Sequence, residues 1–117
     1  MKSIILVLFL TILTQYEMHA QNEFELDPNQ SMLMTGKGAG QDGAINPYYG
    51  QDCYAIVENM GESDFSIRIQ QAGKIIETIP IANQEVKKVK LLKGYELYFD
   101  TNSTAKVNAK LDFEKID

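Results

Sequence analysis

The residues best able to do chemistry gather in one glycine-rich stretch, TGKGAGQDGAINPYYGQD, from Thr35 to Asp52. Tyr48 and Tyr49 offer flat apolar faces with a polar tip, which suits stacking on sugars or on protein partners. Asp42 and Asn46 add a carboxylate and an amide. We expect these four residues to form a ligand-binding loop. The alternative is an inert connection, in which one tyrosine packs on the core and the glycines only permit unusual backbone angles.

The spacing in this stretch argues against a phosphate site and gives little support to a calcium site. Phosphate loops carry GxxxxGK[ST], or GxGxxG between a strand and a helix, whereas no helical pattern follows the glycines of 36–40. A calcium loop needs clustered oxygen ligands, and the EF-hand pattern is absent. The scattered oxygen-bearing candidates are Asp42, Asn46, Asp52, Asp27 and Asn29. We predict no metal ion and no cofactor, with calcium as the alternative.

Catalysis has little support in the composition. The only histidine, His19, lies in the N-terminal segment, so the rest of the chain has no Ser-His or Cys-His pair and no histidine ligand for zinc or copper. Glu58 and Glu62 are carboxylates of the kind that hydrolyse glycosides, but they flank a turn, where solvated charge is the better interpretation. We therefore predict no catalytic residues.

Cys53 is the only cysteine, so no disulfide can form within the chain. It opens the apolar run CYAIVEN, and free cysteine is among the most buried residue types. We expect a buried structural thiol. An intermolecular disulfide and a reactive thiol are the alternatives.

The N-terminus has the layout of a secretory signal peptide. Lys2 precedes an apolar run, Ile4 to Leu13, and a polar stretch then ends at Ala20, a small residue suited to cleavage. The apolar run is too short to span a bilayer, which takes roughly 20 residues. We expect residues 1–20 to be removed and residues 21–117 to form one β-sandwich domain, secreted or periplasmic, with no membrane span. The alternative is a buried N-terminal helix.

The net charge of −5 argues against nucleic acid as a partner, because nucleic-acid binding rests on basic patches. The charge is uneven along the chain. Gln21 to Asp64 holds eight acids and one base, Lys37, whereas Phe65 to Asp117 holds seven acids and nine bases. Ordinary solvated charge is the preferred interpretation, with an acidic and a weakly basic surface as the alternative.

Apolar residues recur at every second position in four segments, a pattern typical of half-buried strands. These segments are AKVNAKLDF (105–113), FSIRIQQ (65–71), YELYFD (95–100) and EVKKVKLL (85–92). In the last segment, Lys87, Lys88 and Lys90 are expected to protect a sheet edge from pairing with another molecule. A surface for acidic polymers is the alternative.

Two further runs, CYAIVEN (53–59) and KIIETIPI (74–81), are apolar on both faces, which predicts strands that are central or covered. Pro80 indicates that the end of the second run lies at a sheet edge. SMLMT (31–35) adds one more strand, and NEFELDPNQ (22–30) adds a short edge strand or a lead-in.

Turn-forming residues separate these runs at even spacing. QAGK, Lys93-Gly94 and Thr101 to Thr104 each predict a hairpin, and the last also holds an N-glycosylation sequon that we interpret as turn chemistry. Short strands with turns about every 8–12 residues predict an all-β sandwich or barrel. We expect a single antiparallel β-sandwich of about seven strands, Ig-like or jelly-roll-like.

These observations favour a non-catalytic binding or interaction module whose partner is an unidentified protein or glycan. Tyr48 and Tyr49 are the expected contacts. The alternative is a structural subunit that assembles through strand edges or through an intermolecular Cys53 disulfide, and an enzyme ranks third.

Overall fold

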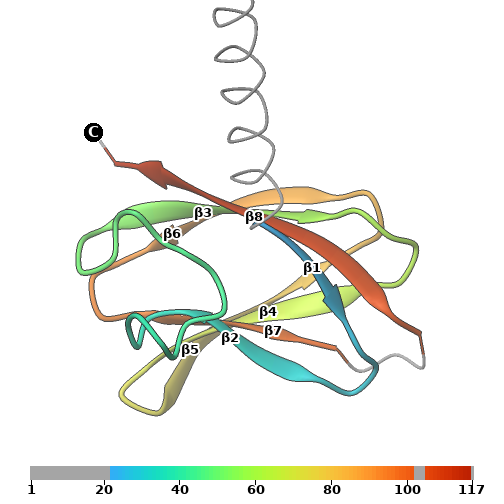
Figure 1. The fold of residues 1–117 in the computed structure, drawn as a ribbon, viewed down its shortest axis with the longest axis horizontal. Coiled ribbons are helices and arrows are strands. Elements are labelled where there is room, and N and C mark those ends of the chain that lie inside the picture. Colours follow the sequence, from blue (N-terminus) through green and yellow to red (C-terminus); the bar gives the residue numbers. More distant parts are fainter. Residues whose placement is uncertain (1–21, 102–104, 117) are drawn as a thin grey trace, which may run out of the picture.

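The computed structural model describes residues 22–101 and 105–116, which form eight β-strands and no helix (Figure 1). The strands are β1 (Glu23–Leu26), β2 (Ser31–Thr35), β3 (Cys53–Asn59), β4 (Phe65–Gln71), β5 (Lys74–Ile81), β6 (Val86–Leu91), β7 (Glu96–Asp100) and β8 (Val107–Lys115). This part of the chain holds no helix long and apolar enough to cross a membrane. The expected signal peptide, residues 1–20, and the sequon at 102–104 lie outside the described residues.

The strands form two antiparallel four-stranded sheets that pack face to face (Figure 1). The first sheet has the order β1-β8-β3-β6 and the second has the order β2-β7-β4-β5. The pairs β1–β8, β2–β7, β3–β6 and β4–β5 are those that one long hairpin would make, with its tip between β4 and β5. The hairpin is wrapped so that β8 also pairs with β3 and β7 with β4, which is the arrangement of a jelly roll.

The predicted all-β antiparallel sandwich is therefore confirmed, and the strand order corresponds to the jelly roll among the two topologies that the sequence left open. The structure has eight strands rather than about seven. The additional strand is β1, which the sequence left as a strand or a lead-in and which pairs with β8.

One of the three predicted hairpins joins neighbours within a sheet. The β4–β5 connection turns at Ala72 and Gly73, which have positive φ angles of 51° and 79°, as a type I′ turn requires. The connections at Lys93-Gly94 and after Thr101 instead cross between the sheets, so the prediction of hairpins there is wrong. Turn-forming residues specify a local change of direction, and that change can lead to either sheet.

Alternating side chains build the core between the two sheets. Phe65, Ile67 and Ile69 on β4 and Leu97 and Phe99 on β7 are all buried, as the period of two predicted. The rings of Phe65 and Phe99 lie 5.1 Å apart between centroids. The first sheet supplies Leu26, Ala55, Val57, Leu91, Val107, Ala109 and Leu111.

The lateral edges at β5 and β6 carry features that discourage pairing with a further strand. β6 lies at the edge of the first sheet, which confirms the edge position expected for the strand of Lys87, Lys88 and Lys90, and their protective role stays a prediction. Lys87 Nζ donates a hydrogen bond to the carbonyl oxygen of Pro80 on β5, the edge of the second sheet, at 2.9 Å. A charged side chain thus bridges the open side of the sandwich.

β5 lies at an edge along its whole length, which confirms the indication from Pro80. The expectation that its two apolar faces would be covered is wrong, because Ile75 and Ile76 are exposed by 62% and 46%. By contrast β3, the other strand with two apolar faces, lies between β8 and β6 as predicted.

Candidate functional site

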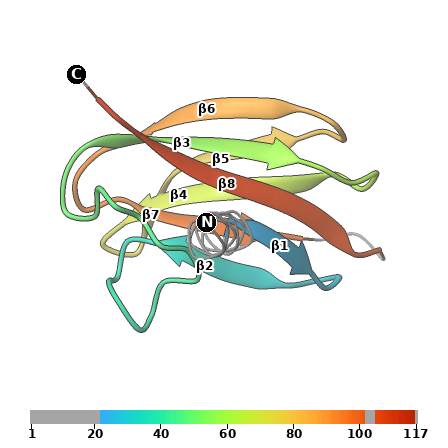
Figure 2. The same ribbon diagram turned by 45° about the horizontal axis from the view of Figure 1, so that its top comes forward.

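Three connections meet at one end of the sandwich, which we call the loop end (Figure 1, Figure 2). They are the glycine-rich loop (36–52), the β6–β7 connection (92–95) and the β4–β5 turn. Asp52 Oδ1 accepts a hydrogen bond from the backbone N–H of Lys93 at 2.7 Å. This bond ties the glycine-rich loop to the β6–β7 connection.

Asp42 shapes the first half of the loop. Its carboxylate accepts hydrogen bonds from three successive backbone N–H groups, those of Gly36 (3.0 Å), Lys37 (2.9 Å) and Gly38 (3.1 Å). Gly36 has a φ of +130°, and a Cβ there would lie 2.7 Å from the Cα of Glu96, so only glycine fits. The carboxylate and the glycine together hold this half of the loop against the start of β7.

The middle of the loop lies along the outer edge of β2. The backbone N–H groups of Gly43 and Ala44 donate to the carbonyl oxygens of Leu33 (3.0 Å) and Met34 (2.9 Å). These two bonds form without a strand in this part of the loop. They cover part of an edge that would otherwise be open.

Asn46 fixes the second half of the loop. Its Nδ2 donates to Thr35 Oγ1 at 3.3 Å and lies 3.8 Å from Cys53 Sγ, while its Oδ1 accepts the backbone N–H of Tyr48 at 2.9 Å. The backbone N–H of Tyr49 donates to the carbonyl oxygen of Asn46 at 3.2 Å. Both tyrosines are therefore held by the same asparagine.

The two adjacent tyrosines have different environments. Tyr48 is partly buried and packs against the hydrophobic core, as the alternative of an inert loop required for one of them. Tyr49 is 53% exposed. The ring of Tyr49 is thus accessible for stacking on a ligand, whereas Tyr48 anchors the loop to the core.

Two hollows flank Tyr49. The first, of about 190 Å³, lies between the glycine-rich loop and the β6–β7 connection. The second, of about 310 Å³, lies within the loop itself. Tyr49 and Asn46 line both hollows, Asp42 lines the second, and the polar residues Thr35, Gln51, Lys93 and Tyr95 line the first. Of the four predicted site residues, the structure brings together Tyr49, Asn46 and Asp42.

Cys53 lies against the first hollow but is only 1% exposed, which confirms the expected buried thiol. Burial raises the pKa of the thiol, the hydrogen bond from Asn46 lowers it in part, and the charge of Asp52 raises it further. The thiol is therefore protonated at neutral pH and is unsuited to act as a nucleophile.

The candidates for a calcium site are not brought together. Asp27 and Asn29 lie in the β1–β2 turn at the opposite end from Asp42 and Asp52 (Figure 1). Among residues 22–101 and 105–116, no group of three or more His, Cys, Asp or Glu side chains is placed to hold a metal ion.

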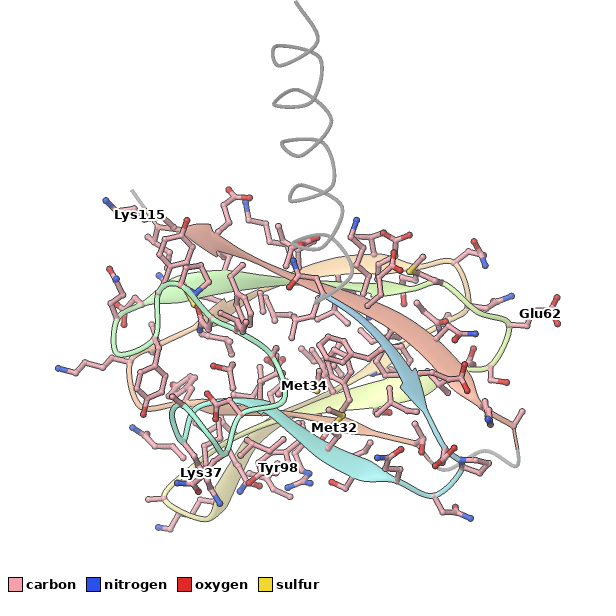
Figure 3. All side chains as sticks on the ribbon, viewed as in Figure 1. Met32, Met34, Lys37, Glu62, Tyr98 and Lys115 are labelled. Atoms are coloured by element: carbon pink, nitrogen blue, oxygen red, sulfur yellow. The ribbon has the colours of Figure 1, made fainter. Side chains whose placement is uncertain are left out.

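A second polar cluster, which the sequence did not predict, covers the outer face of the second sheet. Arg68 donates from Nε and Nη2 to the two carboxylate oxygens of Asp100, at 2.8 and 3.1 Å, and its guanidinium carbon lies 4.2 Å from the centre of the Tyr98 ring (Figure 3). Burial acts to raise the pKa of Asp100, but hydrogen bonds from Arg68 and Ser31 outweigh it and lower the pKa. The donors and acceptors of this cluster mainly form hydrogen bonds with one another. The cluster therefore links the side chains of β2, β7 and β4 and has a structural role.

Comparison of the chain with protein-family models, with curated proteins and with solved structures finds no match.

Proposed function

We propose that the protein is an exported, non-catalytic binding module that binds a glycan chain over the ring of Tyr49. Export rests on the signal-peptide pattern of residues 1–20. The observation that carries the proposal is the position of Tyr49, which is exposed, is held by an ordered loop, and separates two hollows.

The size and lining of the hollows favour sugars. Both are near or below the lower end of the range for drug-sized ligands, about 300 Å³, so each suits one small unit of a longer chain. The ring of Tyr49 offers an apolar face for a sugar ring, and the side chains of Asn46 and Gln51 can bond to hydroxyl groups. The hydrogen bonds of Asp42 and Asn46 order the loop in advance, which lowers the entropic cost of binding.

Glycan-array screening followed by calorimetry tests the proposal on the chain from residue 21 onward. We expect binding of at least one class of oligosaccharide, and Tyr49→Ala should weaken it about tenfold through loss of stacking. Tyr98→Ala, which removes a tyrosine from the outer face of the second sheet, is the matched control and should bind normally. Unchanged affinity in Tyr49→Ala would place the site elsewhere.

Assembly through strand edges or a Cys53 disulfide has less support. The lysines of β6, the loop beside β2 and the proline of β5 each discourage strand addition. The burial of Cys53 keeps its thiol from a second molecule.

A further inference from the structure

We propose that the glycan bound at the loop end carries free amino groups, and that one protonated amine is held in the second hollow by the Asp42 carboxylate and the Tyr49 ring. This inference rests on the proposed function and names the class of sugar. It depends on the charge of the second hollow, on the absence of a cationic partner for that charge, and on the position of Tyr49 beside it.

Asp42 is the charged residue of the second hollow. The other residues that line this hollow are neutral: Ala39, Gly40, Ala44, Ile45, Asn46 and Tyr49. Asp42 accepts hydrogen bonds from three backbone N–H groups, which carry no net charge, so its carboxylate keeps its negative charge. The second hollow therefore offers an anionic group to a ligand.

Asp42 has no ion pair with any lysine or arginine in the described ranges 22–101 and 105–116. Lys37, the nearest base along the chain, has its Nζ 3.7 Å from a carboxylate oxygen of Glu96. The loop segment 36–52 holds two aspartates and one lysine, and the whole chain has a net charge of −5. The local charge and the net charge therefore both favour a cationic ligand over an anionic one.

Gly38 brings the tip of the Tyr49 side chain close to this carboxylate. The backbone N–H of Gly38 donates to Asp42 Oδ1 at 3.1 Å. A Cβ on Gly38 would lie 3.4 Å from the hydroxyl oxygen of Tyr49, so the hydroxyl end of the ring is adjacent to the same glycine. Asp42 and Tyr49 both line the second hollow. A carboxylate and an aromatic ring are thus placed to contact one cation.

A protonated amino sugar suits this arrangement. The ammonium group can donate a charge-assisted hydrogen bond to the carboxylate, and the face of a tyrosine ring attracts a cation. Ile45, which is 65% exposed, adds an apolar surface for the carbon atoms of the sugar ring. Gln51 and Thr35 in the adjoining first hollow can bond to the hydroxyl groups of the next sugar. An N-acetylated amine is neutral and loses both interactions of the cation.

Short oligosaccharides of glucosamine and of galactosamine, each paired with its N-acetylated form, test the inference by calorimetry, because acetylation removes the charge and keeps the sugar chain. In mildly acidic buffer, in which the amines are protonated, we expect at least one amine form to bind about tenfold more tightly than its acetylated form. High salt should narrow the gap. Alkaline buffer, which deprotonates the amines, should abolish it.

Asp42→Asn removes the charge and keeps an oxygen that can accept the backbone N–H bonds. In this variant the amine and acetylated forms should bind within about twofold of each other. A loosened loop would weaken both forms together, so the ratio of the two affinities reports the charge. Asp52→Asn is the matched control, because Asp52 also accepts a backbone N–H bond but lines neither hollow. It should keep the wild-type ratio.

The inference is overturned if no amino oligosaccharide binds, if the amine and acetylated forms bind equally, or if Asp42→Asn leaves the preference intact. Equal affinity for an oligolysine of the same charge would also overturn it, because the sugar would then contribute nothing. The proposed function fails separately. A neutral glycan that binds wild-type protein and is lost in Tyr49→Ala would uphold the binding site and reject the amine.

Discussion

Hydrogen bonds between a polar side chain and the backbone order the connections at both ends of the sandwich, but the ordered segments differ in their exposure. At the end opposite the loop end, Asn59 Nδ2 donates to the carbonyl oxygens of Ser63 (2.8 Å) and Ile81 (3.1 Å), and its Oδ1 accepts the N–H of Gly61 (3.0 Å). Asn59 is fully buried. One amide thus joins the β3–β4 connection to the end of β5 and is sealed in the core.

At the loop end, Asn46 and Asp42 bond to the backbone in a similar way, but the segment that they order carries the exposed Tyr49. The buried amide of Asn59 serves stability at the first end. At the loop end, the partly buried Asp42 and Asn46 hold a segment that presents an aromatic ring to solvent. The comparison suggests that stability and binding can be perturbed separately in this fold.

The largest effect is expected from Asn59→Ala. The substitution removes three hydrogen bonds, one buried and two partly buried, and leaves a cavity in the core, so the free energy of unfolding should fall by about 3 kcal/mol. Urea denaturation measures the change, with the exposed Asn108→Ala as control. A loss below about 1 kcal/mol would mean that water replaces the amide and that the two ends differ less than we argue.

Asp42→Ala should have an intermediate effect on stability and a larger one on binding. The loss of three charge-assisted bonds should lower the free energy of unfolding by about 1–2 kcal/mol. Amide exchange of residues 36–38 should become much faster while that of β4 is nearly unchanged. Equal exchange in wild type and variant would show that the loop is ordered by other contacts.

The smallest effect is expected from the Arg68–Asp100 pair. Because folding lowers the pKa of Asp100 below its ordinary value of 3.8, its contribution to stability is present above that value and is lost as the pH falls through the folded pKa. The pair should contribute roughly 0.5–1 kcal/mol. Asp100→Asn should therefore flatten the decline in stability between about pH 5 and pH 2, measured by thermal unfolding. An unchanged pH profile would show that the Arg68–Asp100 pair does not contribute to the pH dependence of stability.

Much of the fold could be predicted from alternation alone. Phe65, Ile67 and Ile69 are inward because period two fixes the faces of a strand. The sequence could not show which strands are neighbours, since that depends on contacts far apart in the chain. The crossing at Lys93-Gly94 and the meeting of Ser31, Arg68 and Asp100 on three strands follow from the strand order, and neither has a local pattern.

The candidate site could be anticipated only in part for the same reason. Loop length and the tyrosine pair indicated the segment that carries the candidate site, and its role in binding stays a prediction. The role of each residue in the segment depends on backbone geometry. Tyr48 packs on the core and Tyr49 is exposed, while the Asp42 carboxylate accepts hydrogen bonds from the N–H groups of 36–38. Two adjacent residues of one type carry no signal that distinguishes them.

The most direct measurement is NMR chemical-shift mapping during titration with an oligosaccharide that binds. We predict that the largest shifts occur at Tyr49, Asn46 and the β6–β7 connection, with little change at Asn59 and Thr101. Shifts centred on Arg68 and Tyr98, or at the end that holds Asn59, would contradict the account and move the binding surface away from the glycine-rich loop.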